Sequence, residues 1–363
     1  MPMDAFFDIV VIGAGIAGAS LAAAIGARAR VLVIEAEERP GYHTTGRSAA
    51  FWTESYGGPG VQPLTTASGP VLRQLGVLTR REALTLGREG QEAQVAAFAE
   101  RYLAAGVQVE VLDRMGVEGR LPQLRTGWAC GALEPSCCDI DVARLHHHYL
   151  AQARNAGTQL WCRAALTRAE RVGPLWHLVL SDERKVATAI LVNAAGAWAD
   201  AVARVTGARP LGITPYRRTI AQLAVEPAAP EDLPLVLDIS ESFYFKPESG
   251  RLWLSPHDET RSIPCDAAPE EIDVALAIDR FGQVVDWQIQ RVEHRWAGLR
   301  SFAPDRMPVY GFAPDQPAFF WFAGQGGFGI QTAPAAAELG ARLILGEQGG
   351  EIDPAPYSPM RFT

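Results

Sequence analysis

The chain has few cysteines and no long apolar segment. Its 363 residues include five cysteines, an odd number without a C-x-x-C pair, which argues against a disulfide framework and a zinc site. No stretch approaches the roughly 20 uncharged apolar residues of a membrane span. The net charge is −8, so negative charge is in excess. Such a balance disfavours binding to nucleic acid.

These absences define an expected compartment and assembly. The first residues lead almost directly into an apolar strand, without the basic start of a cleavable signal peptide. We therefore expect a cytoplasmic protein without a transmembrane segment, as a monomer or small homo-oligomer.

The run His146 to His148 lies on an expected helix, where neighbouring side chains point about 100° apart. Three such rings cannot converge on one ion, so we expect no metal site.

The most informative motif lies near the N-terminus. A strand, Ile9–Ile12, runs into the G-x-G-x-x-G turn at residues 13–18, and the helix Ala19–Ile25 follows. The three glycines permit a tight turn, close approach of a pyrophosphate and close packing of helix on strand. The helix N-terminus then faces the phosphates. Glu35 ends the next strand, Val31–Ile34, where an acid can bind an adenosine ribose. The sequence predicts a dinucleotide site.

The segment after Glu35 indicates which dinucleotide binds. A NAD domain would normally continue into another strand and helix, but residues 39–50 form a polar loop of small residues. Such a loop suits the ribityl chain and inner phosphate of FAD, with Ser48 and Ala49 small enough to lie against the isoalloxazine ring. The alternative is an ordinary surface loop rich in Ser, Thr and Gly. We predict FAD.

The expected fold class is α/β, with a discontinuous Rossmann-like FAD-binding domain and an α+β substrate domain that contains an antiparallel sheet. The FAD-binding domain is expected over residues 1–50, 140–210 and 301–363, and the substrate-binding domain over 51–139 and 211–300. A second glycine-rich junction, residues 324–329, precedes an expected helix, Ile330–Leu345, whose dipole could stabilise a reduced flavin. Further elements are expected at Asp141–Asn155 and Glu270–Phe281 (helices), and at Thr158–Trp161, Trp176–Leu180, Ala187–Asn193, Thr219–Val225, Leu233–Asp238, Ser242–Lys246, Leu252–Leu254 and Ala318–Ala323 (strands).

Two arginines lie where a substrate domain would meet the flavin. Arg300 stands in the apolar and aromatic run Trp296–Phe302, and Arg218 begins a likely strand. A guanidinium in such surroundings needs an anionic partner, and its planar fork matches a carboxylate. A structural salt bridge is an equal alternative for Arg300 and the stronger one for Arg218. Tyr56 and Tyr244, taken alone, fit core residues with a bonded hydroxyl.

Longer blocks resemble a known family. The segments Ile12–Ser20, Pro40–Ala50, Val192–Trp198, Glu241–Tyr244, Trp296–Phe302 and Gln325–Thr332 are similar to bacterial D-arginine dehydrogenases. Those enzymes form a branch of the D-amino-acid oxidase and sarcosine oxidase class of flavoproteins. The resemblance runs nearly end to end and weakens over 60–130 and after 345.

The resemblance implies two sets of site residues. Arg218 and Arg300 would hold the substrate carboxylate, with Tyr56 and Tyr244 hydrogen-bonding beside it. The remaining substrate-binding residues would be Phe51, Thr53, Glu82, Leu235, Leu237, Gly327 and Gln331. The cofactor-binding residues would be Gly13, Gly15, Ile16, Ala17, Gly18, Glu35, Ala36, Thr44, Thr45, Arg47, Ser48, Ala49, Ala195, Gly196, Trp198, Arg300, Gly326, Gly327, Gly329, Ile330, Gln331 and Thr332.

Three positions qualify what the resemblance implies. Glu82 would match the acid that recognises the guanidinium of D-arginine, although a charged surface cluster is the simpler interpretation of its neighbourhood. Phe51 stands where the family carries a histidine, which favours more apolar substrates. Monomeric sarcosine oxidases attach FAD through a cysteine near the position of Leu299, and no cysteine lies there. We therefore expect noncovalent FAD.

The expected activity is oxidative deamination of D-amino acids with basic or large side chains. Hydride would leave Cα for flavin N5, and the imino acid would hydrolyse to a 2-oxo acid and ammonia, with electrons passing to an acceptor such as a quinone. The protein supplies orientation and electrostatics, and the flavin carries the redox chemistry. The alternatives are a sarcosine or glycine type of amine oxidase, and a flavin subunit devoted to electron transfer.

Overall fold

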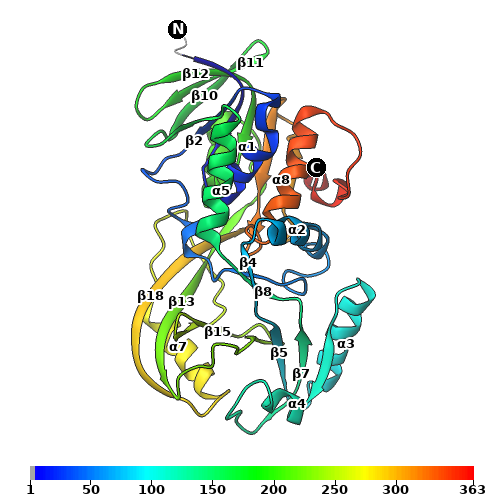
Figure 1. Ribbon diagram of the computed structural model, residues 1–363. Coiled ribbons are helices and arrows are strands. Elements are labelled where there is room, and N and C mark those ends of the chain that lie inside the picture. The colour runs from blue at the N-terminus through cyan, green and yellow to red at the C-terminus, as the bar shows by residue number, and fades with distance from the viewer. Residues whose placement is uncertain (1–4) are drawn as a thin grey trace.

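Two large sheets form the two ends of the molecule. The structure is a computed structural model that describes residues 5–363. One sheet has eight strands and the other has ten. In Figure 1 the eight-stranded sheet and its helices lie in the upper half, with both ends of the chain, and the long strands of the ten-stranded sheet fill the lower half.

The eight-stranded sheet combines segments that lie far apart in the chain. Its order is β10-β11-β12-β1-β2-β9, and β20 and β19 extend it beside β12. Strand β1 pairs in parallel with both β12 and β2, so the first strand of the chain lies at the centre. The strands are β1 (Ala5–Ile12), β2 (Val31–Ile34), β9 (Gln159–Trp161), β10 (Leu166–Val172), β11 (Leu175–Leu180), β12 (Lys185–Asn193), β19 (Val309–Phe312) and β20 (Phe319–Ala323).

Helices cover both faces of this sheet because alternate residues of β1 point to opposite sides. Ile9 and Val11 face a core shared with α1 (Ile16–Ile25), α5 (Val142–Asn155) and α8 (Ala333–Leu345). Val10 and Ile12 face a second core, which includes α6 (Ala199–Thr206). The second half of β1, Ile9–Ile12, is therefore buried on both sides and is a continuous apolar run.

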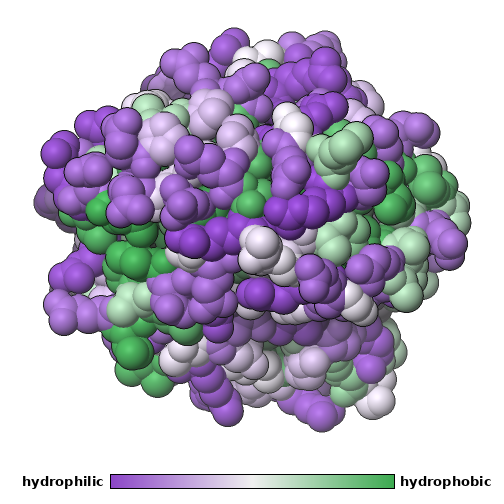
Figure 2. Space-filling view, turned by 90° about the horizontal axis from the view of Figure 1, so that it is seen from below, coloured by the Kyte–Doolittle hydropathy of each residue, from purple (hydrophilic) through white to green (hydrophobic). Residues whose placement is uncertain are grey.

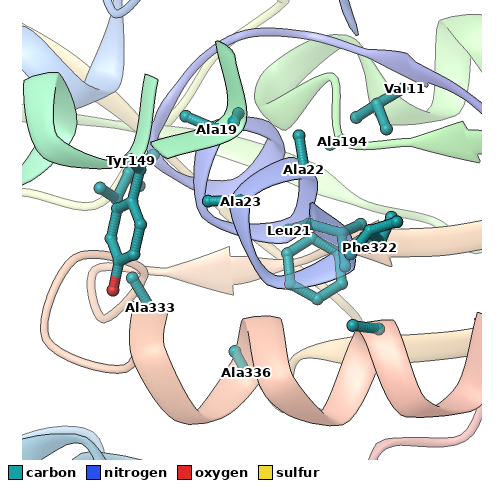
Figure 3. Packing of buried hydrophobic residues seen from close by; sticks show 14 of the residues in the cluster. Val11, Ala19, Leu21, Ala22, Ala23, Tyr149, Ala194, Phe322, Ala333 and Ala336 are labelled. Atoms are coloured by element: carbon teal, nitrogen blue, oxygen red, sulfur yellow. The ribbon is translucent and has the colours of Figure 1, made fainter. Parts of the chain in front are cut away.

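Small side chains let α1 lie close to its neighbours. Figure 3 shows Ala23 of α1 directed toward Tyr149 of α5, Ala22 directed away from α8, and Phe322 of β20 against Leu21. These side chains are almost wholly buried. Alanine fills the contact without losing side-chain entropy, so three helices can share one compact core.

Two helix starts differ from the sequence-based expectation. Helix α1 begins at Ile16 rather than Ala19, so Gly18 lies in its first turn. A β-carbon on Gly18 would lie 1.9 Å from the carbonyl oxygen of Gly13, which explains the glycine. Helix α8 begins at Ala333 rather than Ile330, with proline in its first turn. The start of α5 is confirmed, since the Asp141 side chain caps it by accepting from Arg144 N at 2.9 Å.

The ten-stranded sheet contains a long antiparallel ribbon of β13 and β18. Its order is β21-β18-β13-β16-β15-β14-β5-β7-β6, with β17 beside β13. The antiparallel expectation is wrong for one pair, because β5 joins β14 in parallel where an earlier segment of the chain extends the sheet. The strands are β5 (Ala83–Arg88), β6 (Glu110–Asp113), β7 (Trp128–Glu134), β13 (Thr214–Glu226), β14 (Leu235–Asp238), β15 (Tyr244–Glu248), β16 (Arg251–Ser255), β17 (Thr260–Arg261), β18 (Gln288–Phe302) and β21 (Gln325–Gly326).

The segment between residues 51 and 139 contributes to more than one part of the molecule. Its helix α2 (Gln62–Gln74) packs against α8, where Ser68 Oγ accepts from Ala335 N at 3.2 Å. A small sheet of β3 (Phe51–Trp52), β8 (Cys138–Ile140) and β4 (Leu78–Arg80) lies beside it. Helices α3 (Glu92–Ala104), α4 (Arg114–Glu118) and α7 (Glu271–Gly282) pack with the ten-stranded sheet. The domain limits given above stay a prediction.

The surface of the lower end is mainly hydrophilic. Figure 2 views the molecule from below and shows hydrophobic residues gathered in separate patches among polar ones. Exposed apolar side chains include Met115 of α4 and Val111 of β6, and scattered residues of this kind are normal on a protein surface. Within residues 5–363, no helix is long and apolar enough to cross a membrane.

Candidate functional site

A cleft of about 390 Å³ opens at the carboxyl ends of the central parallel strands. Ile12, Ile34 and Asn193 end β1, β2 and β12, and the residues that follow them line the cleft. This edge is where open α/β sheets bind ligands. The second glycine-rich junction, at residues 324–329, contributes Gln325, Gly326, Gly327 and Gly329 to another wall.

The first glycine turn is shaped for close approach of a ligand. Gly13 has a φ of 100°, and a β-carbon there would lie 2.6 Å from the carbonyl oxygen of Ala194. A β-carbon on Gly15 would lie 3.2 Å from Thr45 Oγ1, which accepts from Ile16 N at 3.0 Å. The turn therefore leaves a cradle that side chains would fill, as a pyrophosphate requires.

One histidine of the run at residues 146–148 supports this turn. His146 of α5 is buried, and its Nε2 lies 2.9 Å from the carbonyl oxygen of Ala14. Because that oxygen only accepts, Nε2 carries the proton. Burial lowers the pKa of His146, so the ring is neutral at physiological pH. Residues 5–363 hold no cluster of three or more His, Cys, Asp or Glu side chains suited to a metal ion.

Glu35 lies at the tip of β2, where a ribose-binding acid is expected. Its Oε2 accepts from Ala14 N at 2.8 Å, and its Oε1 accepts from Glu37 N at 3.0 Å. The carboxylate is thus held at the edge of the cleft beside the glycine turn. An acid in this position can bind the hydroxyls of a ribose.

The polar loop after β2 connects the two sheets across the cleft. Thr44 Oγ1 donates to the carbonyl oxygen of Leu299 at 2.6 Å. Arg47 Nη1 donates to the carbonyl oxygens of Ala267 and Ala297 at 2.9 and 3.2 Å, and Arg47 also pairs with Asp266. Small residues and a 3₁₀ turn at Thr44–Arg47 let the backbone pass close to a ligand here.

Most residues predicted to bind the cofactor do line the cleft. They are Gly13, Gly15, Ile16, Ala17, Glu35, Ala36, Thr44, Thr45, Arg47, Ser48, Ala195, Gly196, Trp198, Arg300, Gly326, Gly327, Gly329 and Ile330. Gly18, Ala49, Gln331 and Thr332 lie outside the lining. The sequence interpretation missed an apolar wall whose only signal was the apolar side of α6 and the start of β10: Ala164, Ala165, Leu166, Ala201, Val202 and Val205.

Arg300 is the central charge at the inner end of the cleft. Its side chain is 8% exposed, and it donates from Nη1 to Tyr56 Oη at 3.3 Å and from Nη2 to Tyr244 Oη at 3.5 Å. Burial opposes the charge, yet Tyr244, Tyr56 and Asp258 raise the pKa of Arg300 above its ordinary value. Arg300 forms no ion pair with any acidic side chain in residues 5–363. A buried guanidinium of this kind favours an anionic ligand.

Gly327 makes room for this constellation. A β-carbon there would lie 2.6 Å from Arg300 Nη1 and 3.3 Å from Tyr56 Oη. Any larger residue would displace the guanidinium or the phenol. The glycine thus connects the second glycine-rich junction directly with the two groups predicted to hold a substrate.

Arg218 lines the same cleft, but it already pairs with an acidic side chain. Its Nη2 lies 3.2 Å from Glu259 Oε1, and its Nε donates to the carbonyl oxygen of Asp258 at 2.8 Å. Its buried Nη1 has no hydrogen-bond partner among the described residues. An unsatisfied buried donor is costly, so Arg218 retains one free donor for an anion.

Aromatic and aliphatic side chains cluster around the two phenols that bind the Arg300 guanidinium. Phe51 lies edge-on to Tyr56 and Tyr244, with ring centroids 5.2 and 5.9 Å apart. Leu235 and Leu237 join the same apolar cluster. We call this group the chamber: Phe51, Tyr56, Leu235, Leu237, Tyr244 and Arg300. The structure thus brings six of the predicted catalytic and substrate-binding residues together.

Glu82, which was predicted to bind substrate, already pairs with other side chains of the protein. Its carboxylate pairs with Arg120 and lies 3.6 Å from Arg80. Both arginines are exposed. In this geometry the carboxylate is already neutralised before any basic substrate arrives.

Thr53 and Gln331 hold the loop that carries Tyr56 rather than lining the cleft. Gln331 Nε2 donates to Tyr56 O at 3.2 Å, and Gln331 Oε1 accepts from Thr53 N at 3.3 Å. Buried Glu134 accepts from Thr53 Oγ1 at 2.6 Å and from Ser55 N at 3.1 Å. These contacts fix the position of the Tyr56 phenol. Glu134 was not singled out in the sequence, where nothing distinguishes it from a surface acid.

His257 is a second residue that the sequence interpretation missed. Its Nε2 lies 3.5 Å from Tyr56 Oη, and its ring centroid lies 5.7 Å from that of Tyr244. Burial and the positive charges of Arg218 and Arg300 lower the pKa of His257 to about 3. The ring is therefore neutral at physiological pH. A lone histidine after β16 carries no sequence signal of this placement.

Comparison with known proteins agrees with this geometry. Residues 8–343 match the family model described as "FAD dependent oxidoreductase". The chain is 25% identical to the hydrogen cyanide synthase subunit HcnC of Pseudomonas aeruginosa over 99% of this chain and 97% of that protein. It is 26% identical to a D-amino acid dehydrogenase of Rhizobium rhizogenes over 77% of this chain and 67% of that protein.

A solved structure shares the fold. The glycine oxidase of Geobacillus kaustophilus superposes with a TM-score of 0.86 at 20% identity, covering 97% of this chain and 98% of that one. The expected fold class and the FAD cofactor are thereby confirmed, and the cleft has the cradle and the acid that FAD needs. The glycine turns, Glu35 and the match over residues 8–343 together assign the chain to the family of DAO-type FAD-dependent oxidoreductases.

Proposed function

We propose that this flavoprotein oxidises the Cα–N bond of D-amino acids. The observation that carries the proposal is the buried Arg300 guanidinium, which lines the cleft, donates to two phenols and has no acidic partner in residues 5–363. A substrate carboxylate would neutralise it with charge-assisted hydrogen bonds. Arg218 Nη1, buried and unpartnered among the described residues, offers a further donor.

The proposed reaction is oxidative deamination. Bound FAD would accept the hydride that leaves Cα, and water would convert the imino acid to a 2-oxo acid and ammonia. The protein's part is to hold the carboxylate at Arg218 and Arg300 and so direct Cα toward the cofactor. Tyr56 and Tyr244 limit the freedom of the guanidinium by accepting its hydrogens. The electron acceptor we propose is a small oxidant such as a quinone.

The choice of D-amino acids rests on the resemblance in the long sequence blocks and on one relative whose name is D-amino acid dehydrogenase. The likeness to glycine oxidase keeps a second function open, oxidation of glycine or N-methyl amines. The chamber is apolar around a carboxylate clamp, which suits either substrate class. A flavin subunit that only transfers electrons is a third possibility, because HcnC is named as a subunit.

Anaerobic bleaching of the flavin separates these functions. We expect several D-amino acids to reduce the bound flavin of the purified chain, and their L-enantiomers and sarcosine to do so more slowly or not at all. The measurement is the loss of flavin absorbance in a stopped-flow instrument, with glycine and N-methyl glycines in the same panel. Faster reduction by sarcosine would favour the amine oxidase. A flavin that no amine reduces would overturn the proposal.

The carboxylate clamp predicts the effect of Arg300→Met. A hydrogen bond to a charged group contributes about 1.5–3 kcal/mol, so affinity for every D-amino acid should fall at least about tenfold, which corresponds to about 1.4 kcal/mol. FAD should stay bound. The measurement is the substrate concentration dependence of flavin reduction in a yellow, folded variant. Arg295→Met, an exposed arginine on the same strand, is the control, and equal affinities in both variants would contradict the clamp.

Side-chain preference can be tested at Glu82 and at its partner Arg120. If Glu82 recognises a distal cation, the wild type prefers D-arginine and D-lysine, and Glu82→Leu should lose that preference while keeping activity on D-phenylalanine. Arg120→Leu should strengthen the preference, since it frees the carboxylate that Arg120 now neutralises. The measurement is kcat/KM for each substrate. If both variants rank the substrates as the wild type does, Glu82 is only a surface charge.

The cofactor is expected to be noncovalent. No cysteine lines the cleft in the described part of the chain, and Gly298 and Leu299 occupy the position where a cysteine tether would lie. Acid precipitation should therefore release yellow flavin into the supernatant, where absorbance and chromatography identify it as FAD. Flavin that remains in the protein pellet would show a covalent bond.

A further inference from the structure

The imidazole of His257 lies between the chamber and the solvent. Its Nδ1 lies 2.6 Å from the carbonyl oxygen of Glu241. That oxygen can only accept, so Nδ1 carries the hydrogen and Nε2 carries a lone pair. Nε2 points to Tyr56 Oη at 3.5 Å, a separation typical of catalytic contacts that shorten when substrate binds.

The backbone is strained to hold this arrangement. His257 has a φ of 54°, and Glu241, which accepts its hydrogen, has a φ of 56°. Two non-glycine residues in the left-handed region facing each other cost stability, and such strain concentrates at functional sites. Arg280 holds both segments, because its Nη1 donates to the carbonyl oxygen of Pro256 at 2.6 Å and to that of Ser242.

The donors and acceptors around the Tyr56 hydroxyl determine which way its hydrogen points. Arg300 Nη1 can only donate, so it donates to Tyr56 Oη. The phenol hydrogen is then free to point at the lone pair of His257 Nε2. A continuous path therefore leads from the guanidinium that would hold the substrate, through one phenol, to an imidazole.

We propose that Tyr56 and His257 form a relay that removes a proton from the ammonium group of the bound substrate. This rests on the proposed function, since hydride can leave Cα only when the amine lone pair is free. An N–H bond of the ammonium breaks and a new O–H bond forms on Tyr56, while the original phenol hydrogen moves to His257 Nε2. The products are a neutral amine, a neutral phenol and an imidazolium, so charge and protons balance.

Electrostatics couples this transfer to substrate binding. The charged and titratable groups that face the imidazole belong to several elements: Arg218 on β13, Arg300 on β18, Arg306 after β18, the phenols of Tyr56 and Tyr244, and the adjacent Asp258 and Glu259. Burial and the three arginines keep the ring neutral. A carboxylate bound at Arg218 and Arg300 cancels positive charge nearby and makes the imidazole more basic. Proton acceptance is thus favoured only with substrate present.

The proton also has an exit. His257 is only partly buried. Glu259 and Thr260, two and three residues further along the chain, are exposed. An imidazolium at this edge can release its proton to water after the amine has reacted. On the other side of the phenol, Phe51 and Tyr244 are buried.

Two substitutions distinguish a relay from simple support of Tyr56. His257→Gln keeps an acceptor for the phenol hydrogen but cannot take the proton, whereas His257→Leu removes both functions. His147→Gln, an exposed histidine on α5, is the control. The measurement is the limiting rate of anaerobic flavin reduction across pH, with whichever amine reduces the wild-type flavin fastest.

We expect the His257→Gln rate to fall at least about tenfold at neutral pH and to approach the wild-type rate at alkaline pH, where the ammonium loses its proton to solvent. The solvent deuterium isotope effect should change in the same pH range, and the control should match the wild type. A His257→Gln profile equal to the wild-type profile overturns the relay alone. A rate lowered equally at every pH also overturns it, because that result indicates support of structure. A wild-type flavin that no amine reduces overturns the proposed function, and the relay with it.

Discussion

The guanidinium of Arg300 is a buried positive charge, and no acidic side chain in residues 5–363 pairs with it. Removal of such a charge from water is costly unless something compensates. Two phenol oxygens compensate in part, at 3.3 and 3.5 Å. The remaining deficit favours an anionic ligand. The apolar rings around it strengthen that attraction because they exclude water.

The pairing of β13 with β18 determines where this charge lies. Tyr216 pairs with Arg300, and Arg218 pairs with Gly298, so both arginines project from the same face of the ribbon. A register slip of one residue would send one guanidinium to the opposite face. The same ribbon also binds the flavin loop, because Gly298 lets Arg47 approach and Ala297 O accepts from it. One strand pair therefore sets the geometry of both the proposed substrate clamp and the cofactor loop.

The loop that carries Tyr56 depends on residues from three distant parts of the chain. Glu134 at the end of β7 and Gln331 before α8 bind its backbone and hydroxyls. His257 after β16 faces the phenol from the third side. Since Glu134 is buried and accepts several hydrogen bonds, it functions as an internal anchor rather than as a surface acid. The phenol, and any relay through it, is held by contacts from the ten-stranded sheet and from the segment before α8.

The sequence determined the nucleotide-binding motif of this protein. The glycine turn, the acid at the end of β2 and the Asp141 cap each follow from the residues at the end of one strand or the start of one helix, so the sequence sufficed to place them. Strand β18 was missed because its exposed half is polar and unpatterned. The Glu82–Arg120 pair, the Glu134 anchor and the placement of His257 were beyond sequence reasoning, since each joins residues that only the tertiary structure brings together. Sequence patterns indicate local backbone conformation and the burial of side chains. Charge pairing around Arg300 depends instead on the register of the sheet and on which loops lie next to one another.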